Sequence, residues 1–168
     1  MKILPILTYE NPILRKRAPE AVRFEDAAFQ TFLDDLAHTM YEKDGVGLAA
    51  PQVGNSVRVI AVTPTPNSFE KQKDGKRDVL IMINPVISKH SWRQSNGEEA
   101  CLSVPEYFGH VMRWNGVTVT YRDRTGVEQS INATGLLARV LQHEIDHLDG
   151  ILFIDRADKV FELSSLQY

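Results

Sequence analysis

The sequence predicts an α+β fold in which short, mostly antiparallel strands pack around a helix near the C-terminus. Two segments repeat apolar residues at helical spacing, and several shorter ones are rich in β-branched residues or alternate between apolar and polar. Turn residues separate these segments. The 168 residues are enough to bury a hydrophobic core. We therefore expect a single domain over residues 1–168.

The first helix is expected within residues 24–45, where apolar side chains recur at helical spacing. Gly45 is placed to end it. The preceding twenty or so residues are interrupted by prolines, and we expect them to run extended against the body of the protein. The next stretch, "GVGLAAPQVG" at 45–54, follows neither the helical nor the strand period.

Strands are expected at 57–63, 79–88 and 117–123, because these segments are apolar, β-branched or cleanly alternating. A polar loop rich in turn residues covers 64–78. The turn "DRTG" leads from the third strand into "VEQSINA" at 127–133, which predicts a β-hairpin.

The second helix is expected at 134–148, with Gly150 just beyond its end. At about 100° per residue, one face gathers apolar residues and both histidines of the segment. This face carries Leu136, Val140, His143 and His147. We expect Arg139, Gln142 and Asp146 to occupy the opposite, polar side.

The same helix contains the motif "QHEIDHLDG" at 142–150, in which two histidines lie four residues apart around a glutamate. Such a motif on a helix is typical of a catalytic metal site. The alternative is two histidines at the edge of the core that donate to backbone carbonyls. The rarity of a chance match and the position of the rings on the buried face favour the metal.

A catalytic ion takes three protein ligands and leaves one position open. In zinc peptidases with a third histidine downstream of the motif, that position corresponds here to Phe153, and a glutamate ligand could only be Glu162, close to the chain end. The upstream candidates are His38, His90, His110 and Cys101. Of these only Cys101 sits in a segment that resembles a site, "NGEEACLSVPE" at 96–106, and a thiolate binds zinc or ferrous iron strongly.

Together, three motifs resemble the signatures of the peptide deformylase family, in the same order and at similar spacing. They are "GVGLAAPQVG" (45–54), "EEACLS" (98–103) and "QHEIDHLDG" (142–150). The resemblance extends from about Ile3 to Asp155. It implies a metal-dependent hydrolase that removes the N-formyl group from the formylmethionine of nascent polypeptides.

The resemblance also implies roles for individual residues. The metal ligands would be Cys101, His143 and His147, and the ion would be Fe²⁺, with Zn²⁺, Ni²⁺ or Co²⁺ as alternatives. Glu144 would transfer the proton, while Gln52 and the backbone N–H of Leu102 would face the developing oxyanion. The expected substrate-binding residues are Val46, Gly47, Glu99, Leu136 and Val140. Glu99 would also accept the second N–H of a metal-bound imidazole. Apart from the resemblance, Asp146 lies at the polar edge of its helix and is expected to pair with Arg113 on a neighbouring segment.

Two features depart from the family pattern. Ala100 stands where the central motif usually has glycine, so it either strains a left-handed backbone or crowds the substrate channel. The chain after His147 is short, although it has room for a short helix. Docking to the ribosome, a possible partner, would have to use this short segment.

Composition limits the remaining classes. A net charge of −3 gives no general basic face for nucleic acid, and there is no run of about 18 apolar residues to span a membrane. The single cysteine and the lack of a secretory signal favour the cytoplasm. Two alternative functions are a metallopeptidase of the H-E-x-x-H type and a catalytically inactive binding homologue.

Overall fold

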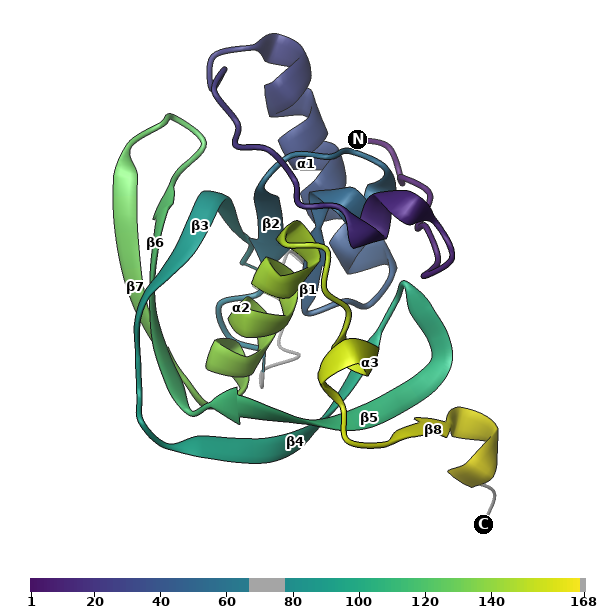
Figure 1. The fold of residues 1–168 in the computed structure, drawn as a ribbon. Helices are drawn as coiled ribbons and strands as arrows, with labels where there is room; N and C mark the ends of the chain where they lie inside the picture. The colour runs from purple at the N-terminus through teal and green to yellow at the C-terminus, as the bar shows by residue number, and fades with distance from the viewer. Residues whose placement is uncertain (67–77, 167–168) are drawn as a thin grey trace.

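The computed structural model describes residues 1–66 and 78–166 (Figure 1). Most of the expected polar loop, residues 67–77, therefore lies outside the described part. The elements are η1 (Pro12–Arg15), α1 (Ala27–Glu42), β1 (Gly47–Ala49), η2 (Ala50–Val53), β2 (Val59–Val62), β3 (Leu80–His90), β4 (Gln94–Cys101), β5 (Val104–Trp114), β6 (Gly116–Arg122), β7 (Glu128–Thr134), α2 (Gly135–Leu148), α3 (Phe153–Arg156), β8 (Val160–Glu162) and η3 (Leu163–Leu166).

The strands form two antiparallel sheets. One has the order β1-β2-β3-β6-β7, and the other has the order β4-β5-β8. In Figure 1 the helix α2 lies in the middle of the molecule, with strands of both sheets around it. The expected α+β fold, with antiparallel strands around a C-terminal helix, is thus confirmed.

The short strand β2 packs against both long helices, α1 on one face and α2 on the other. All four of its residues are buried, because helices pack on both of its faces. Ile60 and Val62 belong to the hydrophobic cluster around α2, whereas Val59 and Ala61 belong to the cluster that includes the apolar face of α1. Alternate side chains point to opposite faces of a strand, so β2 serves both cores. It thereby fixes β1, its neighbour, between α1 and α2.

Helix α1 is capped by Asp26, whose side chain accepts a hydrogen bond from the backbone N–H of Phe29 at 3.0 Å. Such an N-cap stabilises a helix by about 1 kcal/mol. Its fully buried apolar residues are Leu33, Leu36 and Met40, which recur at helical spacing.

Helix α2 is buried on almost every side, and here one expectation was wrong. Gln142 and Asp146, expected on a polar outer side, are both buried. The Gln142 side chain bonds to the backbone N–H and carbonyl of Trp114, and Asp146 is paired with arginines. The helix is therefore enclosed by sheets on its polar side as well, where each polar group has a specific partner.

Gly150 ends α2 and fits there for two reasons. Its φ is +76°, a left-handed conformation that favours glycine. In addition, a Cβ at this position would lie 2.7 Å from the backbone carbonyl carbon of Arg15. The expected extended N-terminal segment thus passes directly against the end of α2, and the backbone N–H of Ala18 donates to the carbonyl of Leu148 at 2.8 Å.

The hairpin of β4 and β5 was not anticipated from periodicity. Strand β4 is mostly polar and exposed, and its regular pairing with β5 runs from Gln94 opposite Trp114 to Ala100 opposite Phe108. The end of the chain, expected to hold a short helix, forms the single turn α3. It then pairs with β5 through β8, with Tyr107 opposite Glu162.

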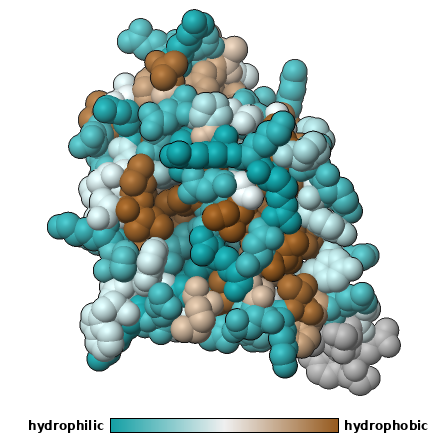
Figure 2. Space-filling view, viewed as in Figure 1, coloured by the Kyte–Doolittle hydropathy of each residue, from teal (hydrophilic) through white to brown (hydrophobic). Residues whose placement is uncertain are grey.

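No helix among the described residues is long and apolar enough to cross a membrane. On the face shown in Figure 2, hydrophobic residues form separate patches among hydrophilic ones. The exposed large hydrophobic residues include Val22, Val86, Trp92 and Leu163.

Candidate metal centre

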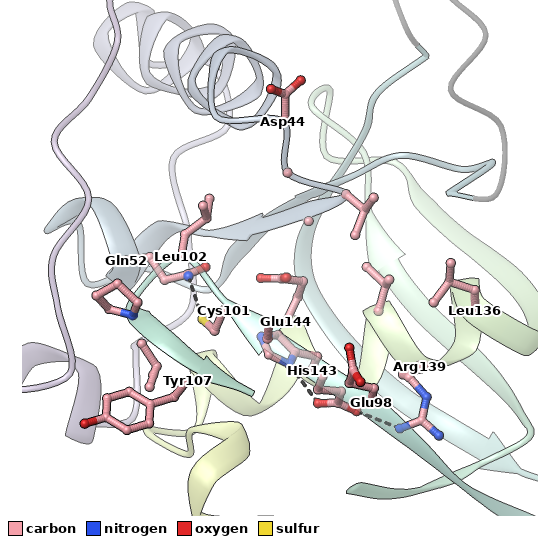
Figure 3. Close-up of a pocket in the computed structure, with 18 of the residues that line it drawn as sticks. Asp44, Gln52, Glu98, Cys101, Leu102, Tyr107, Leu136, Arg139, His143 and Glu144 are labelled. Carbon is pink, nitrogen blue, oxygen red and sulfur yellow. Dashed lines mark hydrogen bonds and ion pairs between the residues drawn. The ribbon is translucent and has the colours of Figure 1, made fainter. Parts of the chain in front are cut away.

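The end of β4 and the C-terminal half of α2 bring three potential metal ligands together. Cys101, His143 and His147 each offer one ligand atom, and these atoms all lie within 4.8 Å of one another. The Cys101 Sγ is 3.3 Å from Nε2 of His147. Figure 3 shows Cys101 and His143 facing each other in the pocket. One thiolate and two imidazoles suit a zinc or ferrous ion and leave one position open, so this donor set fits a catalytic ion.

The two histidines have different surroundings. Nδ1 of His143 lies 2.9 Å from Oε2 of Glu99, which fixes the ring and leaves its other nitrogen for a metal. His147 is 1% exposed. Burial lowers the pKa of His147 well below its usual range, and the charge on His143 adds to this. A neutral imidazole is the form that binds a metal.

Glu144 lies beside the cluster and is itself buried. Burial raises the pKa of its carboxyl group to about 7. Its Oε2 is a buried atom without a hydrogen-bond partner among the described residues. A buried carboxyl oxygen without a partner is unfavourable unless a ligand or water reaches it, so this atom also fits a site that receives a reactant.

Gly47 of β1 makes room for that carboxyl group. A Cβ on Gly47 would lie 2.8 Å from both Cγ and Cδ of Glu144, closer than such atoms approach in proteins. Glycine at this position therefore lets the Glu144 carboxyl group keep its place, because any Cβ there would displace it.

The amide of Gln52 is held in one orientation. Its Oε1 accepts from the backbone N–H of Ala49 at 2.8 Å, so its Nε2 must point the other way. That nitrogen donates to Oγ of Ser103 at 3.1 Å and lies 3.4 Å from the Cys101 Sγ. Leu102 follows Cys101 directly, and its side chain packs against the hydrophobic cluster that includes the apolar face of α1. The donors of Gln52 thus face the candidate metal position.

A pocket of about 470 Å³ opens beside the cluster. Ten of the eleven residues predicted for the site border it or belong to it: Val46, Gly47, Gln52, Glu99, Cys101, Leu102, Leu136, Val140, His143 and Glu144. His147 lies deeper. The pocket also contains Tyr107 of β5 and Leu163 of η3, which the sequence did not indicate. Pairing of β5 with β8 places the segment that contains Leu163 beside the pocket.

The predicted pairs around Glu99 and Asp146 are both present. Arg113 donates two hydrogen bonds of 2.9 Å to the Glu99 carboxylate, and a third to Asp146. Arg139 donates to Glu99 as well, at 2.9 Å. Burial opposes ionisation of Glu99, but hydrogen bonds from Arg113 and His143 lower its pKa to about 2. Glu99 is therefore a fixed anion behind His143.

Ala100 does not strain the backbone. The described residues other than glycine that have positive φ are Asp44, Asn84 and Glu106, and Ala100 lies in regular pairing with Phe108. Ala100 also borders the pocket. Of the two effects expected of this residue, only crowding of the channel is left as a prediction.

Comparison with known proteins agrees with this geometry. The family model for polypeptide deformylase matches residues 3–162. The chain is 48% identical to a peptide deformylase of Wolinella succinogenes over 92% of this chain and 88% of that protein. It is 42% identical to one of Rhizobium meliloti over 95% and 88%. The solved peptide deformylase of Thermotoga maritima superposes with a TM-score of 0.83 at 35% identity, covering 95% of this chain and 100% of that one. That of Legionella pneumophila gives 0.83 at 39% identity, covering 94% and 87%.

A carboxyl group and an open pocket next to a possible thiolate–imidazole metal site are the features of a metal-dependent hydrolase. The comparisons with known proteins identify one family within the metal-dependent hydrolases. The chain belongs to the peptide deformylase family, whose members remove N-formyl groups from formylated nascent peptides. The comparisons do not support the alternatives, a metallopeptidase or an inactive binding homologue.

Proposed function

We propose that residues 1–168 form one catalytic domain that deformylates formylmethionyl peptides in the pocket between β1, β4 and α2. Cys101, His143 and His147 would hold one divalent ion. The observation that carries this proposal is the convergence of their ligand atoms within 4.8 Å of one another at the wall of the pocket. The resemblance of the motifs favours Fe²⁺ as the ion, with Zn²⁺, Ni²⁺ and Co²⁺ as alternatives.

When bound, the ion supplies Lewis acidity, which lowers the pKa of a water molecule toward about 7 and polarises the formyl carbonyl. Glu144 accepts the proton of the attacking water through its Oε2, which has no hydrogen-bond partner in the described part of the chain. It then returns this proton to the nitrogen of methionine as the C–N bond breaks and formate leaves. One carboxyl group can act as base and then as acid when its pKa lies near the working pH, and burial places that of Glu144 at about 7.

Gln52 and Leu102 stabilise the charge that develops on the formyl oxygen. The Nε2 of Gln52 is aimed at this region by the bond from Ala49 to its Oε1. The backbone N–H of Leu102 is the second donor, next to Cys101 in the chain. Loss of one such donor costs about 2.7–4 kcal/mol in the transition state. A neutral amide suits this task, since a charged side chain would compete for the ion.

The pocket selects the methionine side chain through its apolar wall. Val46, Leu136 and Val140 provide this wall, and the latter two share the α2 face with His143. Gly47 allows an extended substrate backbone to approach the edge of β1. Glu99 lies at the pocket border, where it orients the ring of His143 and thereby affects substrate binding indirectly.

The single cysteine is consistent with an enzyme that functions in the reducing environment of the cytoplasm. The substrate, a nascent peptide, makes the ribosome a further partner to test. Docking would use the segment after α2, which contains the short elements α3, β8 and η3.

The test compares formyl-Met-Ala-Ser, its acetyl analogue and the free peptide, with formate or acetate release as the readout. We expect strong cleavage of the formyl peptide and at least ~10-fold slower cleavage of the acetyl peptide, because one extra methyl group in a tight pocket costs about 1–3 kcal/mol. The free peptide should remain intact. Anaerobic metal analysis should find one ion per chain, and Cys101→Ala should lose most of it. Comparable formyl and acetyl rates would refute the tight pocket, and full metal retention by Cys101→Ala would refute the ligand set.

A further inference from the structure

A row of alternating charges leads from α3 to the metal ligand His143. Arg156 donates to both oxygens of Asp146, at 2.6 and 2.7 Å. Asp146 accepts from Arg113, and Arg113 in turn holds both oxygens of Glu99 at 2.9 Å. Glu99 lies 2.9 Å from Nδ1 of His143. Within the row, Asp146, Arg113 and Glu99 each lie between two partners, and Glu99 also accepts a hydrogen bond from Arg139.

Because most of the row is buried, the arrangement of its inner charges depends on the outermost residue, Arg156. The side chains of Arg113 and Glu99 are each 4% exposed and that of Asp146 is 10%, whereas Arg156 is 44% exposed. Buried charges hold their positions only when fully paired, and removal of one partner leaves the other uncompensated. The fork of Arg156 also fixes the plane of the Asp146 carboxylate, as bidentate pairs do.

The same single turn touches His143 from its apolar side. The ring of Phe153 stacks near that of His143, with centroids 6.3 Å apart and an angle of 21° between the planes. Phe153 is fully buried. Helix α3 therefore contacts one metal ligand directly through Phe153 and indirectly, through three buried charges, from Arg156.

We infer that Arg156 is a positioning residue of the metal centre: its fork on Asp146 holds Arg113 and Glu99 in the arrangement that orients His143. This inference rests on the proposed function, in which His143 binds the ion. Partners behind a metal ligand typically change metal affinity by 10–100-fold when they are replaced. Arg156 is the most exposed member of the row, so its replacement disturbs the core least.

The experiment measures the dissociation constant of the metal-free protein for Co²⁺ by chelator competition, together with the urea midpoint of unfolding. Arg156→Met keeps the aliphatic part of the side chain and removes the fork. We expect ~10-fold weaker Co²⁺ binding, and an intermediate loss for Arg156→Lys, which keeps the charge. The matched control is Arg15→Met. Arg15 pairs with Asp155 on the same turn, and both of these side chains are 40% exposed. The Arg15→Met variant should bind Co²⁺ with an affinity within about 2-fold of that of the unmodified protein.

Two results would overturn the inference. One is unchanged Co²⁺ affinity in Arg156→Met with a lowered urea midpoint, which would indicate a purely structural pair. The other is additivity of Arg156→Met and Asp146→Asn, because a residue that acts through Asp146 should add little once Asp146 is changed. If Arg156→Met does not fold, Arg156→Lys decides: weakened affinity supports the inference and unchanged affinity overturns it. Absence of Co²⁺ binding by the unmodified protein would instead refute the proposed function.

Discussion

Glu144 combines three properties in one side chain: it is buried, burial raises its pKa to about 7, and its Oε2 has no hydrogen-bond partner among the described residues. Glu144→Gln preserves the shape and removes the ability to carry a proton. We expect the variant to fold and bind metal normally while turnover falls by at least ~10², the usual scale of general acid–base catalysis. Steady-state kinetics with parallel metal analysis checks this. Turnover close to that of the unmodified protein would assign the proton transfer to another group.

Gly47 gives a second test of the same carboxyl group, from the opposite side. An added Cβ would lie 2.8 Å from Cγ and Cδ of Glu144, so the Glu144 carboxyl group must move in the Gly47→Ala variant. We expect turnover to fall by ~10-fold or more with bound metal unchanged, because small misplacement of a catalytic group is costly. Gly116→Ala is a suitable control, since its Cβ would meet its nearest neighbour at 3.5 Å. Unaltered kinetics in Gly47→Ala would mean that Glu144 does not need its present position.

At the scale of elements, the hairpin of β6 and β7 depends on one charged turn residue. Asp123 accepts hydrogen bonds from the side chain of Thr125, from Gln129 and from backbone N–H groups, which together lower its pKa to about 2. In the unfolded chain the pKa is about 3.9. The folded carboxylate therefore adds stability above pH ~4, and this is lost as the pH falls toward 2.

We accordingly expect Asp123→Asn to unfold at lower urea than the unmodified protein at pH 7. The difference should narrow as the pH falls below about 4. Urea titrations at a series of pH values measure it, and Thr125→Val, which removes one donor, should give a smaller effect in the same direction. A difference that is constant from pH 7 to 3 would contradict the role of the charge.

Local pattern determined which elements could be predicted. Helices α1 and α2 were expected from apolar periodicity. Strands β2, β3 and β6 were expected from apolar, β-branched or alternating residues, and β7 from the turn that precedes it. His143 and His147 were found for a similar reason, since their spacing along one helix is visible in the sequence. Strand β4 is polar on most of its length and is held by pairing with β5, so no periodicity reveals it. Arg156 and Leu163 likewise reach the site only through tertiary contacts.

At the scale of the whole molecule, the candidate ion would connect parts of the fold that are separate in the chain. Cys101 belongs to the sheet of β4, β5 and β8, whereas His143 and His147 belong to α2, which packs mainly against the other sheet. Glu99 and the arginines behind it link the same two parts. Binding of an ion should therefore stabilise the junction between them as well as complete the site.

Metal removal tests this connection. A ligand that binds only the folded state stabilises it by about 4.1 kcal/mol at a concentration 1,000 times its dissociation constant. We expect Co²⁺ at that excess to raise the free energy of unfolding by up to about this amount relative to protein in EDTA, less whatever affinity the unfolded cysteine and histidines retain. Urea unfolding measures the gain, and Cys101→Ala should lose most of it. Amide hydrogen exchange should show added protection in the β4–β5 hairpin as well as in α2, because the ion joins them. An equal gain in Cys101→Ala would mean that the cysteine does not bind the ion. Protection confined to α2 would mean that the ion does not join the two sheets, which are then held by side-chain packing and by the ion pairs of Glu99.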